Sequence, residues 1–420
     1  ETEAIRCCAL CMTRRSGEAE KMVSMKKIAE NKKILKVMFT ALLVLACFQN
    51  LRVVPFMDGA ALKVVHIASL AFFPFLCVKK EIRINKPIAG YVVYIIIISL
   101  LDLSGYGLSS LMFNYIFGVY LVVLCTNCGE NLSYNDWLDV VCCAATILMI
   151  VVQIKNVRGY ENFVWYFEHP DKGHPWGLRT IISDGLNLES TWLGMFAFFF
   201  YRSRWKWFYA GVNMLTAFLY GSRAGMLVGG AAIVWLLLPE LVKLRERKYR
   251  ILAGIVIGAA AVVLYASGLY DAVIGRALSR FFNGFQDAGS MGRIRMWQYA
   301  VQTFLKNPWG CGAGNCMKAV SAVSGEYYSE GNIHNVYLQN LIDQGLLGEL
   351  VYFGMLGRFF WKEKGSILKN PFVAVALVYC GISMIQFRGG ETLMFILLGM
   401  ELTGDAWQED LLKLKNPFQK

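Results

Sequence analysis

Long apolar runs decide what this chain can fold into. Stretches of about 17–22 residues with few charges recur along the sequence, and a helix of that length crosses a hydrocarbon core of about 30 Å. Hydrophobic residues make up 56% of the chain and charged residues 17%, whereas soluble domains hold about 45–50% and about 25%. The pattern predicts an all-α polytopic membrane protein with about twelve transmembrane helices. We expect these spans near residues 34–49, 62–78, 88–104, 108–126, 135–154, 188–201, 205–221, 224–241, 250–268, 335–360, 372–387 and 390–404.

The distribution of lysine and arginine predicts which side of the membrane each loop faces. Basic segments flank alternate ends of the predicted spans, and short loops rich in these residues stay in the cytoplasm. Met22 or Met25 is a candidate start of the natural chain. The predicted arrangement is a basic cytoplasmic segment 1–33, a single membrane domain 34–404 with two long extracytoplasmic loops at about 155–187 and 269–334, and a cytoplasmic tail 405–420.

The net charge of +12 does not indicate nucleic-acid binding. Most of the excess lies in the cytoplasmic segments, where anionic lipid headgroups attract lysine and arginine. We expect no metal and no cofactor, because His169 and His174 lack a third ligand, and the glycine run 310–314 does not follow a strand as a dinucleotide loop does. Cys311 and Cys316 lie in the outer loop and either form a disulfide or remain thiols.

His334 closes the second outer loop and opens an apolar helix. An imidazole can transfer a proton near neutral pH, which makes His334 a candidate general base. Asn335, Gln339 and Asp343 follow at intervals of four residues and therefore share one face of that helix. A polar stripe entering a membrane faces the bundle interior or a water-filled cavity. We therefore expect a hydrated crevice that opens outward beside His334.

Arginines on the same predicted side are candidate phosphate ligands, because the guanidinium group binds phosphate with two parallel hydrogen bonds. Arg293 and Arg295 open an amphipathic helix expected over residues 292–306, lying on the outer leaflet. Arg223 stands at the start of a predicted span, where the helix dipole also favours an anion. Arg179 precedes Glu189, and we expect this carboxylate either to pair with an arginine or to orient a sugar hydroxyl. Three further arginines are expected to face solvent or headgroups: Arg276, Arg280 and Arg388.

Taken in order, these segments resemble the O-antigen ligase and O-antigen polymerase superfamily of bacterial membrane glycosyltransferases. The resemblance covers about residues 175–360, and no motif matches in the first half of the chain. The matching elements are Arg179 ahead of Asn187–Ser190, the Gly-Ser-Arg-Ala-Gly turn at 221–225, Arg293-x-Arg295-x-Trp297, Asn307-Pro308-Trp309-Gly310-x-Gly312-x-Gly314, His334-Asn335-x-Tyr337-Leu338, and Asp343-Gln344-Gly345-Leu346-Leu347-Gly348.

The resemblance implies a fold similar to the GT-C glycosyltransferases, in the plasma membrane of a bacterium. It implies transfer of a glycan from undecaprenyl diphosphate on the outer face, with no nucleotide sugar, metal or cofactor. Arg223, Arg293 and Arg295 would hold the donor diphosphate, and His334 would act as base or orient the acceptor. The expected partners are the lipid-linked donor, a lipid-linked or terminal glycan acceptor and membrane lipids, with a chain-length regulator and a flippase as companion proteins.

Three functions remain open at this point. The first is a polysaccharide polymerase that transfers a growing glycan to a sugar hydroxyl of a lipid-linked repeat unit. The second is a ligase that transfers the finished glycan to a lipid A core or another terminal acceptor. The third is a flippase for lipid-linked oligosaccharides, which predicts charged residues in mid-membrane along a two-sided pathway, whereas here the arginines gather at one face.

Overall fold

We describe the fold from a computed structural model of the chain. It describes residues 32–48, 52–55, 61–77, 81–109, 111–169, 172, 174–182, 185–243, 288–328, 332–387 and 389–403. Most of the basic N-terminal segment, the C-terminal tail and the expected span at 250–268 lie outside these ranges. Arg276, Arg280 and Arg388 also lie outside them.

Helices dominate the described residues, which confirms the all-α prediction apart from one short hairpin. Residues 32–47 are helical, and strands β1 (Arg52–Pro55) and β2 (Ala61–Lys63) pair antiparallel. The helices that follow are α2 (Val64–Leu70), α3 (Phe73–Cys77), α4 (Lys86–Leu101), α5 (Leu111–Cys128), α6 (Tyr134–Arg158), α7 (Tyr160–Glu168), α8 (Leu186–Ala197), the 3-10 helix η2 (Phe198–Arg202), α9 (Lys206–Leu219), α10 (Arg223–Lys243), α13 (Ala288–Lys306), α14 (Cys316–Ser324), α15 (Val336–Glu363), α16 (Pro371–Ile382) and α17 (Thr392–Leu402).

Two described helices, α5 and α6, are long and apolar enough to cross a membrane by length and composition. Shorter apolar helices occupy 64–77, 86–101, 223–238, 371–382 and 392–402. Two expected segments contain helix boundaries that the sequence did not indicate. The run at 62–78 is divided into α2 and α3, and the expected loop at 155–187 holds the end of α6 and the whole of α7. The count of twelve spans and the assignment of sides stay predictions.

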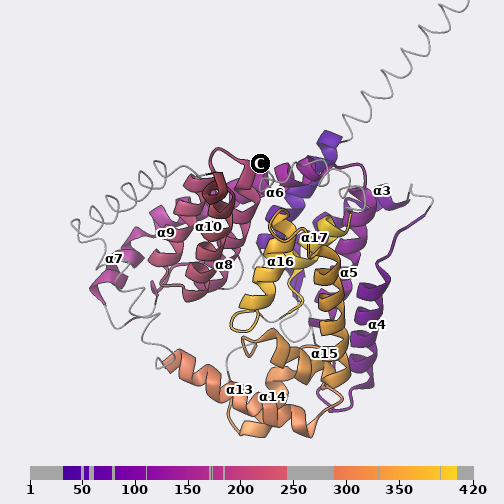
Figure 1. The fold of residues 1–420 in the computed structure, drawn as a ribbon. Helices are drawn as coiled ribbons and strands as arrows, with labels where there is room; N and C mark the ends of the chain where they lie inside the picture. The colour runs from indigo at the N-terminus through magenta and orange to yellow at the C-terminus, as the bar shows by residue number, and fades with distance from the viewer. Residues whose placement is uncertain are drawn as a thin grey trace, which may run out of the picture.

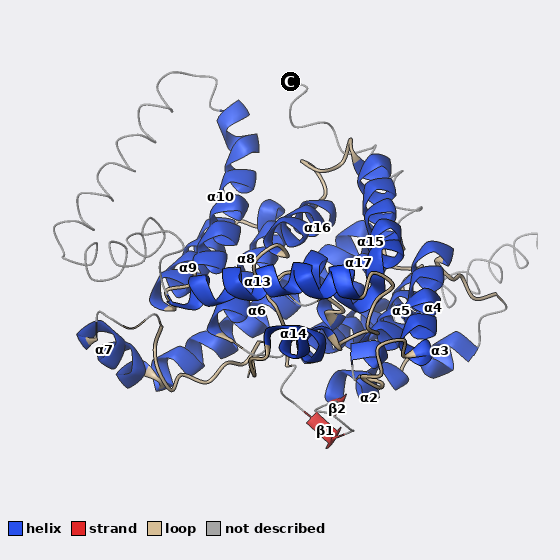
Figure 2. Ribbon diagram, turned by 90° about the horizontal axis from the view of Figure 1, so that it is seen from below, coloured by secondary structure: helices blue, strands red, loops and turns tan. Residues whose placement is uncertain are grey.

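The helices form two groups with a cap across one end (Figure 1). Helices α8, α9 and α10 pack together with α6, and helices α4, α5, α15 and α17 pack together with α16. Helix α16 also contacts α10 and η2, which joins the two groups. Helices α13 and α14 cross the end of the bundle, and Figure 2 looks onto them. All candidate functional segments that the structure describes lie near this capped end or lead into it.

Helix α15 is broken at Gly345, where the sequence predicts one continuous span over 335–360. Gly345 has φ 72° and ψ −178°, a backbone conformation that glycine adopts without the steric cost other residues meet. The break frees backbone groups, and groups of this kind inside a membrane protein must find partners within the protein. The N–H groups of Cys311 and Gly312 donate to the carbonyls of Ile342 and Asp343, both at 2.8 Å.

The other side of the break is closed in the same way. Leu346 N–H donates to the Pro308 carbonyl at 3.0 Å, and the Tyr94 hydroxyl donates to the Gln344 carbonyl at 2.7 Å. The loop at 307–315 therefore supplies backbone hydrogen-bond partners for the groups exposed by the break in α15, and we call this loop the backbone plug. This explains its glycines without a nucleotide, because a Cβ added at Gly310 would lie 2.7 Å from Gly345 N.

Candidate functional site

His334 lies in a left-handed turn immediately before α15. Its φ is 54°, a conformation that costs a residue other than glycine on the order of 1–3 kcal/mol and is concentrated at functional sites. Its N–H donates to Asn332 Oδ1 at 2.8 Å. Asn335 then caps the helix, because its Oδ1 accepts from Leu338 N–H at 3.0 Å. The side chain of His334 is half-buried at this helix entrance.

Helix α13 connects His334 to Arg223. At its first turn, Ser290 Oγ accepts a hydrogen bond from the Arg223 guanidinium at 2.9 Å. Two turns later, Trp297 Nε1 donates to the carbonyl of Ile333, the residue before His334, at 2.7 Å. Seven helical residues span about 10 Å. The segments that carry Arg223 and His334 are therefore held about two turns apart on one helix.

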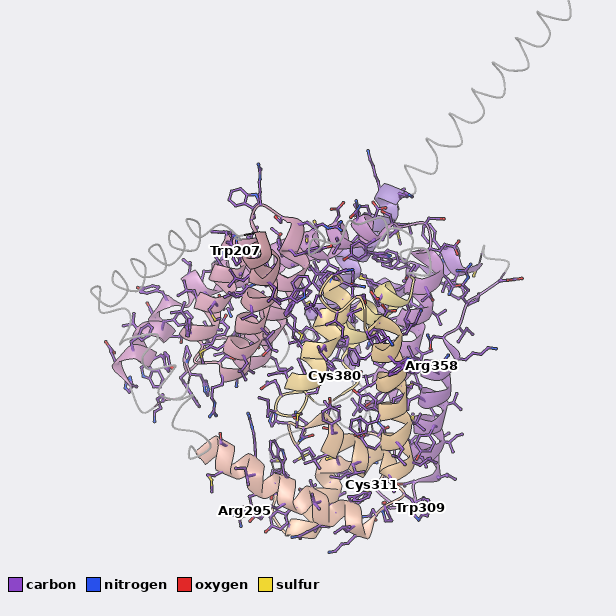
Figure 3. The ribbon with its side chains drawn as sticks, in the orientation of Figure 1. Trp207, Arg295, Trp309, Cys311, Arg358 and Cys380 are labelled. Atoms are coloured by element: carbon purple, nitrogen blue, oxygen red, sulfur yellow. The ribbon has the colours of Figure 1, made fainter. Side chains whose placement is uncertain are left out.

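The two arginines of α13 lie in different surroundings. Arg293 is three residues after Ser290 and four before Trp297, so the three share one helix face, and its side chain is half-buried. Arg295 is exposed and forms an ion pair with Glu326 at 2.6 Å. Figure 3 shows Arg295 at the outer edge of the capped end, on the same helix. Of the two, Arg293 is the one that shares the helix face of Ser290 and Trp297, the residues that contact Arg223 and Ile333.

This difference predicts unequal effects of two matched substitutions. If these arginines bind phosphate, as the sequence predicts, Arg293→Ala is expected to weaken diphosphate binding by about 10–100-fold, the cost of losing one hydrogen bond to a charged group. Arg295→Ala is expected to change it by less than about threefold, because exposed ion pairs contribute little. Titration of each variant with inorganic diphosphate measures both. Equal losses in the two variants would contradict the assignment of Arg293 over Arg295.

A helix covers the expected range 292–306, but it begins earlier, at Ala288. It ends before Asn307 as predicted, and the apolar side chains expected along one face are divided between two environments. Met296 and Ala300 are buried against α14 and α15, whereas Val301 and Leu305 are 45% and 70% exposed. Trp297 and Phe304 are partly buried against the same cluster. One face of α13 therefore packs on protein, and only the other is available to a lipid surface.

The deeper part of the polar stripe of α15 faces the protein interior, one of the two environments expected for it, and the crevice expected beside His334 stays a prediction. Gln339 and Asp343 are each 2% exposed. Asp343 accepts hydrogen bonds from Gly314 N–H at 2.8 Å and from Cys316 N–H at 2.7 Å. The backbone plug fills the space beside this stripe. The position of Asp343 thus accounts for the loop geometry, and its role toward a substrate stays a prediction.

Glu189 is fully buried, and its partner is a lysine rather than the expected arginine. Oε1 of Glu189 binds Lys155 Nζ and accepts from the Tyr220 hydroxyl at 2.7 Å. Oε2 accepts from the N–H groups of Ile181 and Ile182 at 2.6 and 2.9 Å. Arg179, which lies two residues before Ile181 in the sequence, is exposed at the surface. Sequence reasoning missed Lys155 and Tyr220, although Tyr220 directly precedes the Gly-Ser-Arg-Ala-Gly turn.

The two cysteines that the sequence left either paired or free are free thiols in this structure. Cys311 and Cys316 are both buried, and burial raises the pKa of both thiols above the ordinary value. Buried thiols of high pKa are poor nucleophiles. Among the described residues no group of His, Cys, Asp and Glu has the arrangement of a metal site.

The segment that carries this site matches a known family. The family model described as O-antigen ligase matches residues 208–353. The matched stretch includes Arg223, α13 and His334, and Glu189 precedes it. No curated protein and no solved structure matches the chain.

Proposed function

We propose, from the membership of residues 208–353 in the O-antigen ligase and O-antigen polymerase superfamily, that this protein is a polysaccharide polymerase. It transfers a glycan from undecaprenyl diphosphate to a sugar hydroxyl of a lipid-linked repeat unit, on the outer face of a bacterial plasma membrane. The observation that carries the proposal is the bridge made by α13. Through Ser290 and Trp297 it holds Arg223 and the residue before His334, with Arg293 between the two contacts.

The chemistry follows from the residue types at this bridge. The oxygen of the acceptor hydroxyl forms a bond to the anomeric carbon, while the bond from that carbon to the diphosphate oxygen breaks. The leaving diphosphate gains negative charge, which Arg223 and Arg293 stabilise with permanently charged donors. The hydroxyl proton goes to His334. A single displacement of this kind inverts the anomeric centre, and retention seen by NMR of the product linkage would refute it.

The sugar and the acceptor depend on residues that the bridge does not include. The ligase reading keeps the same donor and the same base and changes only the acceptor, to a lipid A core or another terminal glycan. The flippase reading needs no base. These alternatives therefore predict different products in cells that carry a damaged site.

We expect Arg223→Ala to abolish polymer in a deletion strain complemented with the variant, with single repeat units still on lipid carrier or core. Loss of one preorganised donor to the developing charge costs about 10²–10³ in rate. Polysaccharide gels measure the chain length. Arg202→Ala is the matched control, since Arg202 binds Asn135 at 2.7 Å and belongs to η2, away from α13.

The gel separates the alternatives. Full-length polymer that stays on its undecaprenyl carrier would identify a ligase. Normal polymer on its normal acceptor would exclude Arg223 from the site and favour the flippase reading. The control variant is expected to make polymer of wild-type length, and membrane abundance of each variant is measured on an immunoblot of the same samples.

A further inference from the structure

The buried carboxylate of Glu189 binds two segments that each carry an arginine of the candidate site. Oε2 holds the N–H groups of Ile181 and Ile182, two and three residues after Arg179. Oε1 accepts from Tyr220, three residues before Arg223. Segments from before α8 and from the α9–α10 turn thus meet at one side chain.

The connection from Tyr220 to Arg223 is short and rigid. Gly221 N–H donates to the Phe218 carbonyl and Ser222 N–H to the Ala217 carbonyl, both at 2.9 Å. Ser222 Oγ then accepts from Gly225 N–H at 3.0 Å, which caps the first turn of α10. Arg223 is the first residue of that helix, so a shift of Tyr220 is transmitted to it across two hydrogen-bonded residues, Gly221 and Ser222.

Close packing between helices α8 and α10 adds a second connection. A Cβ added at Gly225 would lie 2.4 Å from Ser190 Oγ, and one added at Gly194 would lie 3.1 Å from Gly229 N. Ser190 is the residue after Glu189. The helix turn that carries Glu189 therefore touches the helix turn that carries Arg223 directly, as well as through Tyr220.

Lys155 completes the network from α6. Its Nζ binds Glu189 and donates to the Tyr220 hydroxyl at 2.7 Å, and the single proton of that hydroxyl has two acceptors at 2.7 Å, Glu189 Oε1 and Asn156 Oδ1. The side chain of Lys155 is 13% exposed and that of Glu189 0%. A buried ion pair usually adds little stability compared with apolar side chains of the same volume. What the ion pair provides that apolar side chains would not is hydrogen bonds that fix the positions of Ile181, Ile182 and Tyr220.

We propose that Glu189, Lys155 and Tyr220 form a positioning network that holds Arg179 and Arg223 in register for a diphosphate. The inference rests on the proposed function, because it assumes that these arginines bind the donor. Glu189 is a positioning residue here and touches no substrate. The sequence also allowed a second role for Glu189, the orientation of a sugar hydroxyl. That role would need a carboxylate oxygen free to accept a hydrogen bond from the sugar, whereas each oxygen of Glu189 has two donors within the protein.

The test uses undecaprenyl diphosphate, the carrier common to every glycan donor of this kind, as the probe. The Kd is measured for the full chain in nanodiscs. Glu189→Gln keeps the shape but puts an amide donor where a carboxylate oxygen accepted two hydrogen bonds. It is expected to raise the Kd about tenfold, within the range for side chains coupled in one hydrogen-bond network. Tyr220→Phe, which leaves the Lys155–Glu189 ion pair in place, is expected to raise it about threefold.

Two further measurements separate positioning from a general loss of structure. Glu401→Gln is the matched control, because Glu401 is on α17 and its carboxylate accepts from the Asn370 amide at 3.0 Å to each oxygen. It is expected to lower the thermal midpoint as Glu189→Gln does, without changing the Kd. In a protein that already carries Arg223→Lys, Glu189→Gln is expected to raise the Kd further by less than about threefold, because coupled residues are not additive.

The outcomes distinguish the two proposals. If the wild-type protein does not bind undecaprenyl diphosphate, the proposed function fails. If the wild type binds it and Glu189→Gln and Tyr220→Phe bind it equally well, the positioning network alone is overturned. An unchanged tenfold effect of Glu189→Gln in the Arg223→Lys background would overturn the positioning of Arg223 by this network, since the carboxylate would then act independently of that arginine.

Discussion

Replacement of His334 by asparagine is expected to reduce glycan transfer by about 10²–10⁴-fold, the usual contribution of a positioned general base. Asparagine is the informative choice, because it tolerates the left-handed backbone better than most residues and the φ of His334 is 54°. The turn before α15 should then persist while the titratable group is lost. The measurement is the initial rate of transfer with purified protein, at saturating lipid-linked donor and acceptor.

The matched control is His169→Asn. His169 stacks on Trp165 at 4.3 Å between ring centroids, in the other long loop of the chain. This variant is expected to keep the wild-type rate. If His334→Asn also kept its rate while its thermal midpoint was unchanged, His334 would not be the base.

The second large effect concerns the break in α15. Gly345→Ala is expected to destabilise the protein by more than about 3 kcal/mol. Two unfavourable effects act together, backbone strain and a steric clash of the added Cβ, and each is a known cause of severe destabilisation. The backbone is left-handed, with φ 72°, and the added Cβ would lie 2.4 Å from the carbonyl carbon of Trp309. That neighbour is backbone and cannot rotate away. We expect little monodisperse protein in detergent and a thermal midpoint below that of the wild type.

Gly354→Ala provides the control within the same helix. A Cβ added at Gly354 meets nothing within 4 Å, and alanine favours a helix over glycine by up to about 1 kcal/mol. This variant is expected to be as stable as the wild type or slightly more stable. A midpoint for Gly345→Ala equal to that of Gly354→Ala would show that the helix is continuous in the folded protein.

The helices were predictable from the sequence, because apolar runs and caps are local signals. The helix with Arg293 ends at Asn307-Pro308 as its sequence indicates. Asn335, which the spacing predicts on the polar face of the helix, instead caps its first turn. The break at Gly345 was not predictable, since a glycine inside an apolar run is also common in continuous helices. Whether the helix is continuous or broken at Gly345 depends on contacts with Pro308 and Trp309, which lie 36 or more residues earlier in the chain.

The site was predictable as a set of residue types but not as an arrangement. Arg293 and Arg295 look equivalent in the sequence, and only the packing of α13 on Ile333 and the position of Glu326 separate them. The partner of Glu189 was missed for the same reason, because Lys155 lies 34 residues upstream on another helix. Long-range pairing of this kind leaves no periodic signal in the sequence.

The bridge made by α13 also determines how this protein can be recombined with its relatives. Ser290 contacts Arg223, and Trp297 contacts Ile333. Replacement of α13 alone by the corresponding helix of a relative would therefore change one partner in each of these two contacts. A hybrid with its junctions inside 223–334 must match both contacts simultaneously. Junctions before the Gly221 turn and within the second half of α15 leave the whole bridge with one parent, so altered product specificity in such hybrids could be assigned to the acceptor side.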